Sequence, residues 1–130
     1  MIVDSSALVA ILQYEPEALR LTTAIVESSP CRLPASCFLE TSMLMIGRRT
    51  EDAVRDLDLY VARSRIEITP FTESQALLAR EAFRRYGKGR HPAQLNFGDC
   101  MAYALATETG EALLFKGTNF GRTDVTVAAY

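Results

Sequence analysis

The segment Asn-Phe-Gly-Asp-Cys-Met-Ala-Tyr-Ala-Leu-Ala, residues 96–106, is the stretch around which the rest of the chain is organised. One acid, Asp99, stands at the start of a run that is otherwise suited to burial. Apolar residues follow at helical spacing, which predicts a helix that begins at Asp99 and is packed on several sides. The unpaired N–H groups and the dipole of its first turn favour an ionised carboxylate there. Asp99 is therefore either a helix-capping residue or part of an acidic site.

A second acid lies near the start of the chain. Met1-Ile2-Val3 is a short apolar run that ends at Asp4, and a serine pair and an apolar run follow it. A strand, a turn and a helix start are typical of a β–α unit, in which functional residues collect at the carboxyl ends of strands. Asp4 stands at such an end. Capping of the next helix is the alternative, and it fits Ser6 better than Asp4, because a capping serine makes a second cap redundant.

The rest of the chain alternates helices with short strands. Periodicity and capping residues predict helices over 15–26, 37–48 (capped by Ser36), 51–64 and 73–86, and strands over 31–34, 66–68, 112–115 and, at an edge, 125–127. Glu40 lies in the first turn of an almost wholly apolar helix, where it is either stabilised at the surface by the helix dipole or directed into a cleft. This order predicts an α/β fold, with a parallel sheet between helical layers, in a single domain over residues 1–130.

Composition excludes several classes of protein. With 48% hydrophobic and 23% charged residues, the chain has the composition of an ordinary soluble globular protein. It shows no membrane-spanning run and no signal peptide, so we expect a cytoplasmic protein without a membrane partner. The net charge of −2 argues against coating nucleic acid by bulk electrostatics, but not against a nuclease whose acids are neutralised by a cation. Cys31, Cys37 and Cys100 are expected to be reduced core residues, and the single histidine, His91, excludes a His-rich metal site.

Three acids that are distant in sequence have comparable positions in the predicted fold. Asp4 ends a strand, while Glu40 and Asp99 each lie near the start of a helix. In a doubly wound sheet such points converge on one edge, and clustered carboxylates are tolerated when a divalent cation lies among them. Oxygen ligands favour Mg²⁺ or Mn²⁺, and such a site serves phosphoryl transfer.

A basic, glycine-containing loop over residues 87–92 leads into the Asp99 segment. Arg85, just before it, and Lys88 and Arg90 within it are candidate contacts for RNA phosphates. The alternative is a solvated loop, since the sequence shows no aromatic platform for base stacking beside it.

Several segments carry a resemblance that extends from end to end and in order. They are Ile2-Val3-Asp4-Ser5-Ser6-Ala7-Leu8, Glu40 in an apolar helix, Tyr86-Gly87-Lys88-Gly89 leading to Leu95-Asn96-Phe97-Gly98-Asp99-Cys100, Leu114-Phe115-Lys116-Gly117, and Phe120 with Thr123-Asp124. In these segments the chain resembles the PIN-domain ribonuclease toxins of VapBC toxin–antitoxin systems. The resemblance implies a PIN-like three-layer α/β/α sandwich with a short parallel central sheet, and a metal-dependent endoribonuclease.

The resemblance also implies partners and roles. It implies a homodimer that a VapB-like antitoxin inhibits by covering the cleft, in a heterotetramer or a larger assembly. Asp4, Glu40 and Asp99 would form the acidic site for Mg²⁺ or Mn²⁺, with Asp4 and Asp99 as the likeliest direct ligands, and Ser6 would support Asp4. The helix around residues 43–46, with Met43, Leu44 and Ile46, would either line a groove for the antitoxin or the second subunit, or be plain core.

One position departs from the family pattern. Asn119 stands where the family usually has an acid, so an amide oxygen replaces a charged ligand there. Asp124 is close in sequence and is a candidate supporting acid. The alternative function is therefore a PIN-fold module that binds RNA or antitoxin with weak or no catalysis. A phosphatase with Asp4 as nucleophile is disfavoured, because Ser6 stands where the second acid of such enzymes is expected.

Overall fold

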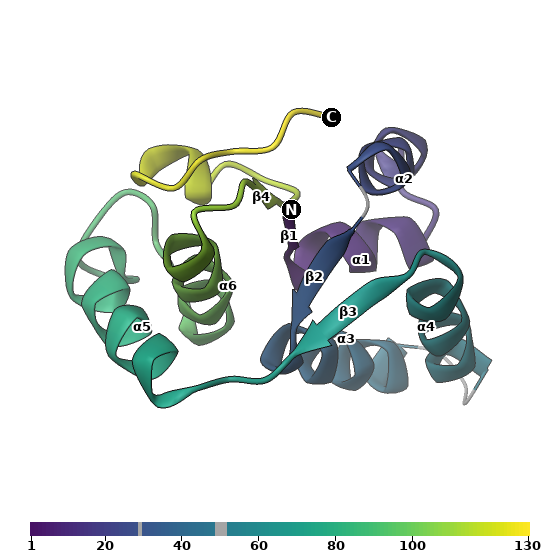
Figure 1. Ribbon diagram of the computed structural model, residues 1–130, viewed down its shortest axis with the longest axis horizontal. Coiled ribbons are helices and arrows are strands. Elements are labelled where there is room, and N and C mark those ends of the chain that lie inside the picture. The colour runs from purple at the N-terminus through teal and green to yellow at the C-terminus, as the bar shows by residue number, and fades with distance from the viewer. Residues whose placement is uncertain (29, 49–51) are drawn as a thin grey trace.

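A short parallel β-sheet lies at the centre of the structure, a computed structural model that describes residues 1–28, 30–48 and 52–130 (Figure 1). Its strands are β1 (Ile2–Val3), β2 (Cys31–Pro34), β3 (Ile66–Thr69) and β4 (Leu113–Leu114), in the spatial order β3-β2-β1-β4. Each neighbouring pair is parallel, with Ile2 opposite both Arg32 and Leu113. The first and last strands of the chain therefore lie side by side. The predicted α/β class with a parallel sheet is confirmed.

Helices cover both faces of this sheet. They are α1 (Ser5–Leu12), α2 (Ala18–Glu27), α3 (Ala35–Arg48), α4 (Asp52–Arg63), α5 (Glu73–Tyr86) and α6 (Phe97–Thr109), followed by the 3₁₀ turn η1 (Phe120–Arg122). Figure 1 shows α5 and α6 together on one side of the sheet and the other helices on the opposite side. The layers are thus those of an α/β/α sandwich. The helix start predicted at Glu51 lies outside the described residues.

Most of the core side chains come from the apolar runs of the sequence. The helix α6 is buried from Cys100 to Ala106, as its all-round apolar pattern predicted. Fully buried side chains from the other elements include Ile2, Leu8, Leu33, Leu57 and Leu114. Cys31, Cys37 and Cys100 are free and buried, which confirms the expectation for the cysteines. In the described part of the chain, no helix has both the length and the apolar character that a bilayer crossing requires.

Two helices start earlier than predicted. The helix α6 begins at Phe97, since the Asn96 side chain accepts the Asp99 N–H at 2.9 Å while the Asp99 carboxylate accepts the Asn96 N–H at 2.8 Å. This reciprocal arrangement is a capping box. The helix α3 begins at Ala35, directly after β2, so Ser36 is not its cap.

Several other elements are shorter than predicted, among them the strand expected over residues 112–115, which is β4 (Leu113–Leu114). The helix α2 begins only at Ala18, because the Ala18 N–H donates to the Glu15 carbonyl at 2.9 Å and closes a turn before the helix; Glu15 and Glu17 form ion pairs with Lys116 in the loop after β4. The expected edge strand over residues 125–127 is reduced to one parallel bridge between Val127 and Leu113. The ion pairs tie the loop between α1 and α2 to the end of β4.

Candidate acidic active site

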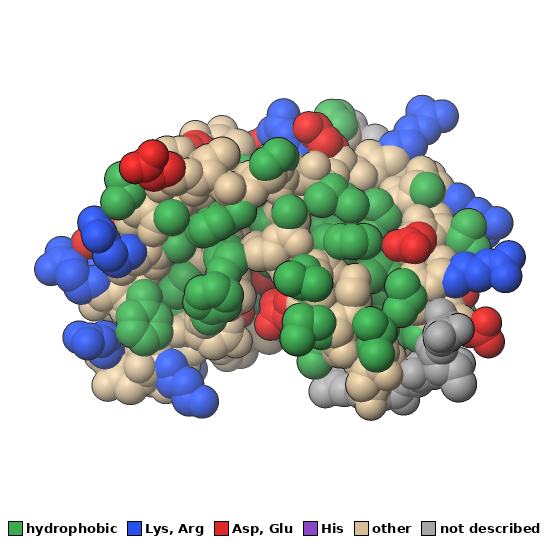
Figure 2. Space-filling model, turned by 90° about the horizontal axis from the view of Figure 1, so that it is seen from below, with side chains coloured by type: hydrophobic (Ala, Val, Ile, Leu, Met, Phe, Trp, Pro, Cys, Tyr) green, Lys and Arg blue, Asp and Glu red, His purple; other side chains and the backbone are tan. Residues whose placement is uncertain are grey.

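The three acids singled out in the sequence line one pocket of about 290 Å³. Asp4 follows β1, Glu40 comes from α3 and Asp99 from α6, and Asn119 lies at the same pocket. The arrows of β2 and β3 point to the lower side of Figure 1, and Figure 2 looks onto that side. There, acidic side chains are visible in a hollow between two hydrophobic areas. The predicted convergence at the carboxyl ends of the strands is thus present.

Asp4 is the N-cap of α1, with an extended backbone. Its Oδ2 atom accepts hydrogen bonds from the Ser6 N–H at 2.9 Å and from the Ser6 hydroxyl at 2.6 Å. The Ser6 oxygen accepts in turn the N–H of Lys116 at 3.0 Å. The view that Ser6 rather than Asp4 caps this helix is therefore wrong, because the extended backbone turns the Asp4 carboxylate onto the first helical turn. The support that Ser6 was expected to give Asp4 is present.

Burial and like charges disfavour ionisation of two of these acids. Asp4 is 1% exposed, and burial, together with the charges of Asp99 and Glu40, raises the pKa of Asp4 to about 6 even though Ser6 hydrogen bonds oppose this. Burial, followed by the charge of Glu40, also raises the pKa of Asp99, whereas hydrogen bonds from Asn96 and Asn119 lower it. A cation in the pocket would relieve this repulsion and favour the ionised forms.

Glu40 points into the pocket and not outward to the surface. It lies in the second turn of α3, since that helix begins at Ala35, and its Oε2 atom accepts a hydrogen bond from the Ser5 hydroxyl at 2.7 Å. Of the two alternatives that the sequence left for Glu40, the structure shows the cleft. Sequence reasoning missed Ser5, because its partner lies 35 residues away and a serine after a strand gives no signal of its own.

The profile of the PIN-domain family matches residues 1–125. Among relatives, the ribonuclease VapC of Mycolicibacterium smegmatis is 46% identical over 125 residues, which are 96% of this chain and 97% of that protein. The chain belongs to the VapC family of PIN domains. Ribonuclease VapC30 of Mycobacterium tuberculosis is 45% identical over 130 residues, which are 99% of this chain and 98% of that protein.

Solved structures share the fold at low sequence identity. Mycobacterium tuberculosis VapC20, described as a toxin that cleaves the sarcin–ricin loop, superposes with a TM-score of 0.76 and 16% identity, covering 96% of this chain and 95% of that chain. VapBC2 of Rickettsia felis, bound to a DNA fragment from its promoter, gives a TM-score of 0.72 and 14% identity, covering 97% and 94%. The PIN-like fold is thereby confirmed.

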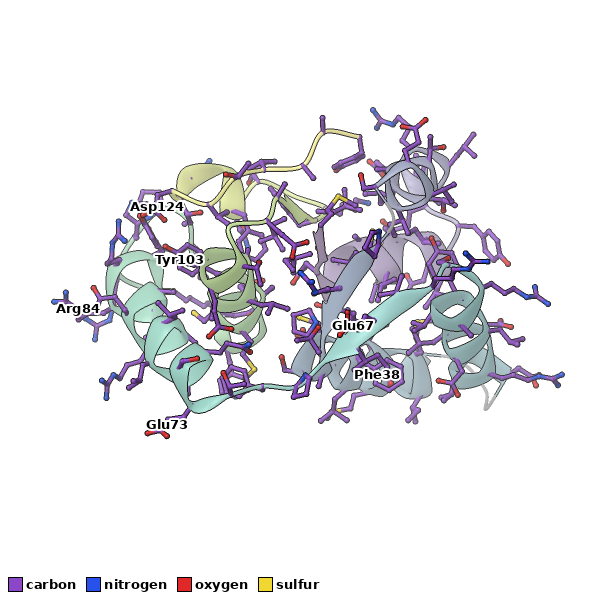
Figure 3. All side chains as sticks on the ribbon, viewed as in Figure 1. Phe38, Glu67, Glu73, Arg84, Tyr103 and Asp124 are labelled. Atoms are coloured by element: carbon purple, nitrogen blue, oxygen red, sulfur yellow. The ribbon has the colours of Figure 1, made fainter. Side chains whose placement is uncertain are left out.

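In this VapC-family chain, Asp124 is not at the acidic pocket. Its carboxylate accepts a hydrogen bond from the Tyr103 hydroxyl at 2.5 Å and pairs with Arg85 at 3.0 Å. Figure 3 shows Tyr103 on α6 and Asp124 in the segment after η1, near the end of α5. Asp124 therefore ties this segment to α5 and α6, while Lys116, Asn119 and Phe120 of the last loop line the pocket.

The basic loop of this VapC-family chain has an aromatic neighbour that the sequence did not reveal. Lys88 and Arg90 are exposed, whereas Arg85 is engaged with Asp124. The Arg90 guanidinium lies 6.0 Å from the centre of the Phe83 ring, which is 41% exposed. Phe83 of α5 therefore lies beside this loop, while the expectation that no aromatic platform for base stacking accompanies the loop stays a prediction.

The donors of the VapC-family pocket suit a cation that keeps part of its water shell. Within residues 1–28, 30–48 and 52–130, no three His, Cys, Asp or Glu side chains lie close enough together to hold a metal ion by themselves. Mg²⁺ is commonly bound through one or two carboxylates and retains several waters. The carboxylates of Asp4 and Asp99, with the amide of Asn119 beside Asp99, fit that mode of binding.

An exposed apolar surface borders the acidic pocket of this VapC-family chain. The helix α3 exposes Leu39, Met43 and Ile46, each at least 59% exposed, while Met45 on its other face is buried. A groove of about 980 Å³ runs between this face and the start of α6, where Phe97 is 80% exposed. The reading of this helix as plain core is therefore wrong for Met43 and Ile46, because only one of its faces packs against the sheet.

Proposed function

We propose that this VapC-family chain is a metal-dependent endoribonuclease toxin, which hydrolyses RNA phosphodiester bonds in the cytoplasm. The observation that carries the proposal is the pocket shared by Asp4, Glu40 and Asp99, three acids from distant parts of the chain. The ribonuclease names of relatives at 45–46% identity over nearly the whole chain support the same activity. A buried carboxylate such as Asp4, with the like charges of Glu40 and Asp99 beside it, is costly without a ligand, so the pocket is better explained by a cation than by stability.

The residues of the pocket have different proposed roles in phosphoryl transfer. Asp4 and Asp99 would hold Mg²⁺ or Mn²⁺, and Ser6 keeps the Asp4 carboxylate in its orientation. When bound, the cation supplies Lewis-acid activation of the phosphate and of water. Glu40 keeps acceptor positions beyond its hydrogen bond to Ser5, and we assign it to orienting the attacking water. Lys88 and Arg90, both exposed, would contact RNA phosphates.

Removal of the metal and substitution of one ligand test this proposal together. The purified chain is expected to cut structured RNA in the presence of Mg²⁺ or Mn²⁺, and excess chelator should abolish the cleavage. Asp99→Asn should abolish cleavage while circular dichroism stays unchanged, because an asparagine oxygen still accepts the Asn96 N–H in the capping box. Asp58→Asn, an exposed acid on α4, is the matched control. Cleavage that persists in excess chelator would refute the proposal.

Two protein partners belong to the proposal. A VapB-like antitoxin would cover the acidic pocket, for which a basic tail is the complementary ligand, since the pocket carries three acids. Structural neighbours from toxin–antitoxin complexes support such a partner. A second copy of the chain would pack on the exposed face formed by Leu39, Met43, Ile46 and Phe97, giving a homodimer and, with antitoxin, a heterotetramer or a larger assembly.

One observation favours a second candidate function. Asn119, at the pocket and beside Asp99, brings no charge to the site. A site with one acid fewer would bind the cation more weakly, and the chain would then serve as a module that binds RNA or antitoxin with little turnover. Restoring an acid at this position separates the two functions.

A further inference from the structure

We propose that Ser5 and Gly98 are positioning residues for Glu40, so that the two adjacent serines of the chain orient two different acids of one pocket. The inference rests on the proposed nuclease function, since it concerns the same acids. It assigns roles to two residues through their contacts with Glu40.

Ser5 holds the Glu40 carboxylate from the side of α1. It is the first residue of that helix and is 8% exposed, and its hydroxyl lies 2.7 Å from Glu40 Oε2. A hydrogen bond to a carboxylate is stronger than one between neutral groups, and burial limits the replacement of Ser5 by water. The next residue, Ser6, donates to Asp4 at 2.6 Å. Because successive helical side chains point about 100° apart, the neighbouring serines reach different acids.

Gly98 permits the approach of Glu40 from the side of α6. A Cβ atom on residue 98 would lie 2.5 Å from Glu40 Oε2 and 2.9 Å from both Cδ and Oε1. Contacts this short do not occur, so any side chain at this position displaces the carboxylate. Gly98 is thus required for close approach. The Glu40 carboxylate is held between the Ser5 hydroxyl and the first turn of α6, whose N-terminal dipole also favours a negative charge.

The contacts of Glu40 connect it to the chain segments that carry Asp4 and Asp99. Asp99 is the next residue after Gly98, and Asp4 immediately precedes Ser5. A shift of Glu40 therefore acts against both chain segments that carry the other two acids. Partners that orient a metal site from behind its ligands typically contribute tenfold to hundredfold in affinity or activity.

The experiment measures Mn²⁺ affinity by electron paramagnetic resonance and RNA cleavage on the same full-length variants. Ser5→Ala is expected to lower kcat for RNA cleavage on the order of tenfold to hundredfold, with Mn²⁺ affinity close to that of the wild type, because Glu40 is assigned to the attacking water and Asp4 and Asp99 to the cation. Ser5→Thr, which keeps a hydroxyl, should restore most of the loss, and Gly98→Ala should reproduce it. The matched controls are Ser42→Ala on α3, whose hydroxyl donates to the Phe38 carbonyl of the same helix, and Gly47→Ala, where a Cβ meets nothing within 4 Å.

Combination with Glu40→Gln distinguishes positioning from general stability. If Ser5 acts through Glu40, Ser5→Ala causes no further loss of cleavage or Mn²⁺ binding in the Glu40→Gln background, because coupled sites are not additive. A full additional loss there, or an unchanged single Ser5→Ala variant of an active wild type, overturns the inference and leaves the proposed function intact. A wild-type chain that neither cleaves RNA nor binds Mn²⁺ overturns both.

Discussion

Relative to the wild type, Asp4→Asn is expected to raise the free energy of unfolding of the metal-free protein at neutral pH but not at acidic pH. The folded chain keeps the Asp4 proton up to about pH 6, whereas an unfolded aspartate releases it near 3.8. Between these values the folded state binds more protons than the unfolded state, so the free energy of unfolding falls as pH rises, and the loss is complete above the folded pKa. At about 1.4 kcal/mol for each pKa unit, the loss is about 3 kcal/mol. An asparagine side chain does not ionise in this pH range, and its amide oxygen still accepts the hydrogen bonds from Ser6.

Urea denaturation in chelator, from below pH 3.8 to above pH 6, measures this effect as the difference between the variant and the wild type. Ionisable groups that the two proteins share cancel in that difference. Asp58→Asn, an exposed acid, should show no such trend. Mn²⁺ at about 1,000 times its Kd should reverse the order at neutral pH, since it adds about 4.1 kcal/mol to the wild type alone, which exceeds the loss of about 3 kcal/mol. A difference that stays constant with pH would refute the argument that burial and like charges disfavour ionised Asp4.

Three further substitutions test separate parts of the structure. Asn119→Asp should tighten Mn²⁺ binding on the order of tenfold, since one unit charge about 4 Å from another is worth roughly 1–4 kcal/mol near a surface. Calorimetric titration measures the change in Mn²⁺ affinity. If the wild type is already active and Asn119→Asp leaves its cleavage rate unchanged, the binding-module function is excluded. Met43→Lys should convert the proposed homodimer to monomer in sedimentation equilibrium without loss of secondary structure, since Met43 is 64% exposed. Phe120→Ala should cost about 3–5 kcal/mol in urea denaturation, because Phe120 is 1% exposed and stacks edge-on against Phe115 at 5.0 Å.

Sequence patterns predicted most of the architecture, since it depends on periodicity and on local capping. The helix α5 has the predicted bounds Glu73–Tyr86, because Thr72 caps it through its own side chain. The short strands and the buried helix α6 followed equally from apolar runs. The errors lie where the deciding contact is distant in sequence. The ion pair between Glu15 and Lys116 joins residues 101 positions apart, and no pattern near Glu15 reveals it.

The acids of the candidate site could be picked out, but their supporting contacts could not. Asp4, Glu40 and Asp99 stood out as charges at the edges of apolar segments. The separation of Asp124 from the pocket depends on Tyr103 and Arg85, which come from two different helices. The role of Ser5 likewise depends on the fold alone. Side chains that are positioned by other side chains leave no local trace in a sequence.

The neighbouring positions of β1 and β4 have a consequence for biosynthesis. The strand that precedes Asp4 pairs with Leu113 and Leu114, and the third acid is contributed by residue 99. A nascent chain that is still being translated therefore lacks both the pairing that fixes its first acid and part of the pocket itself. The complete pocket therefore forms only after synthesis has passed Phe120, and we expect chains that end before β4 to lack RNA cleavage.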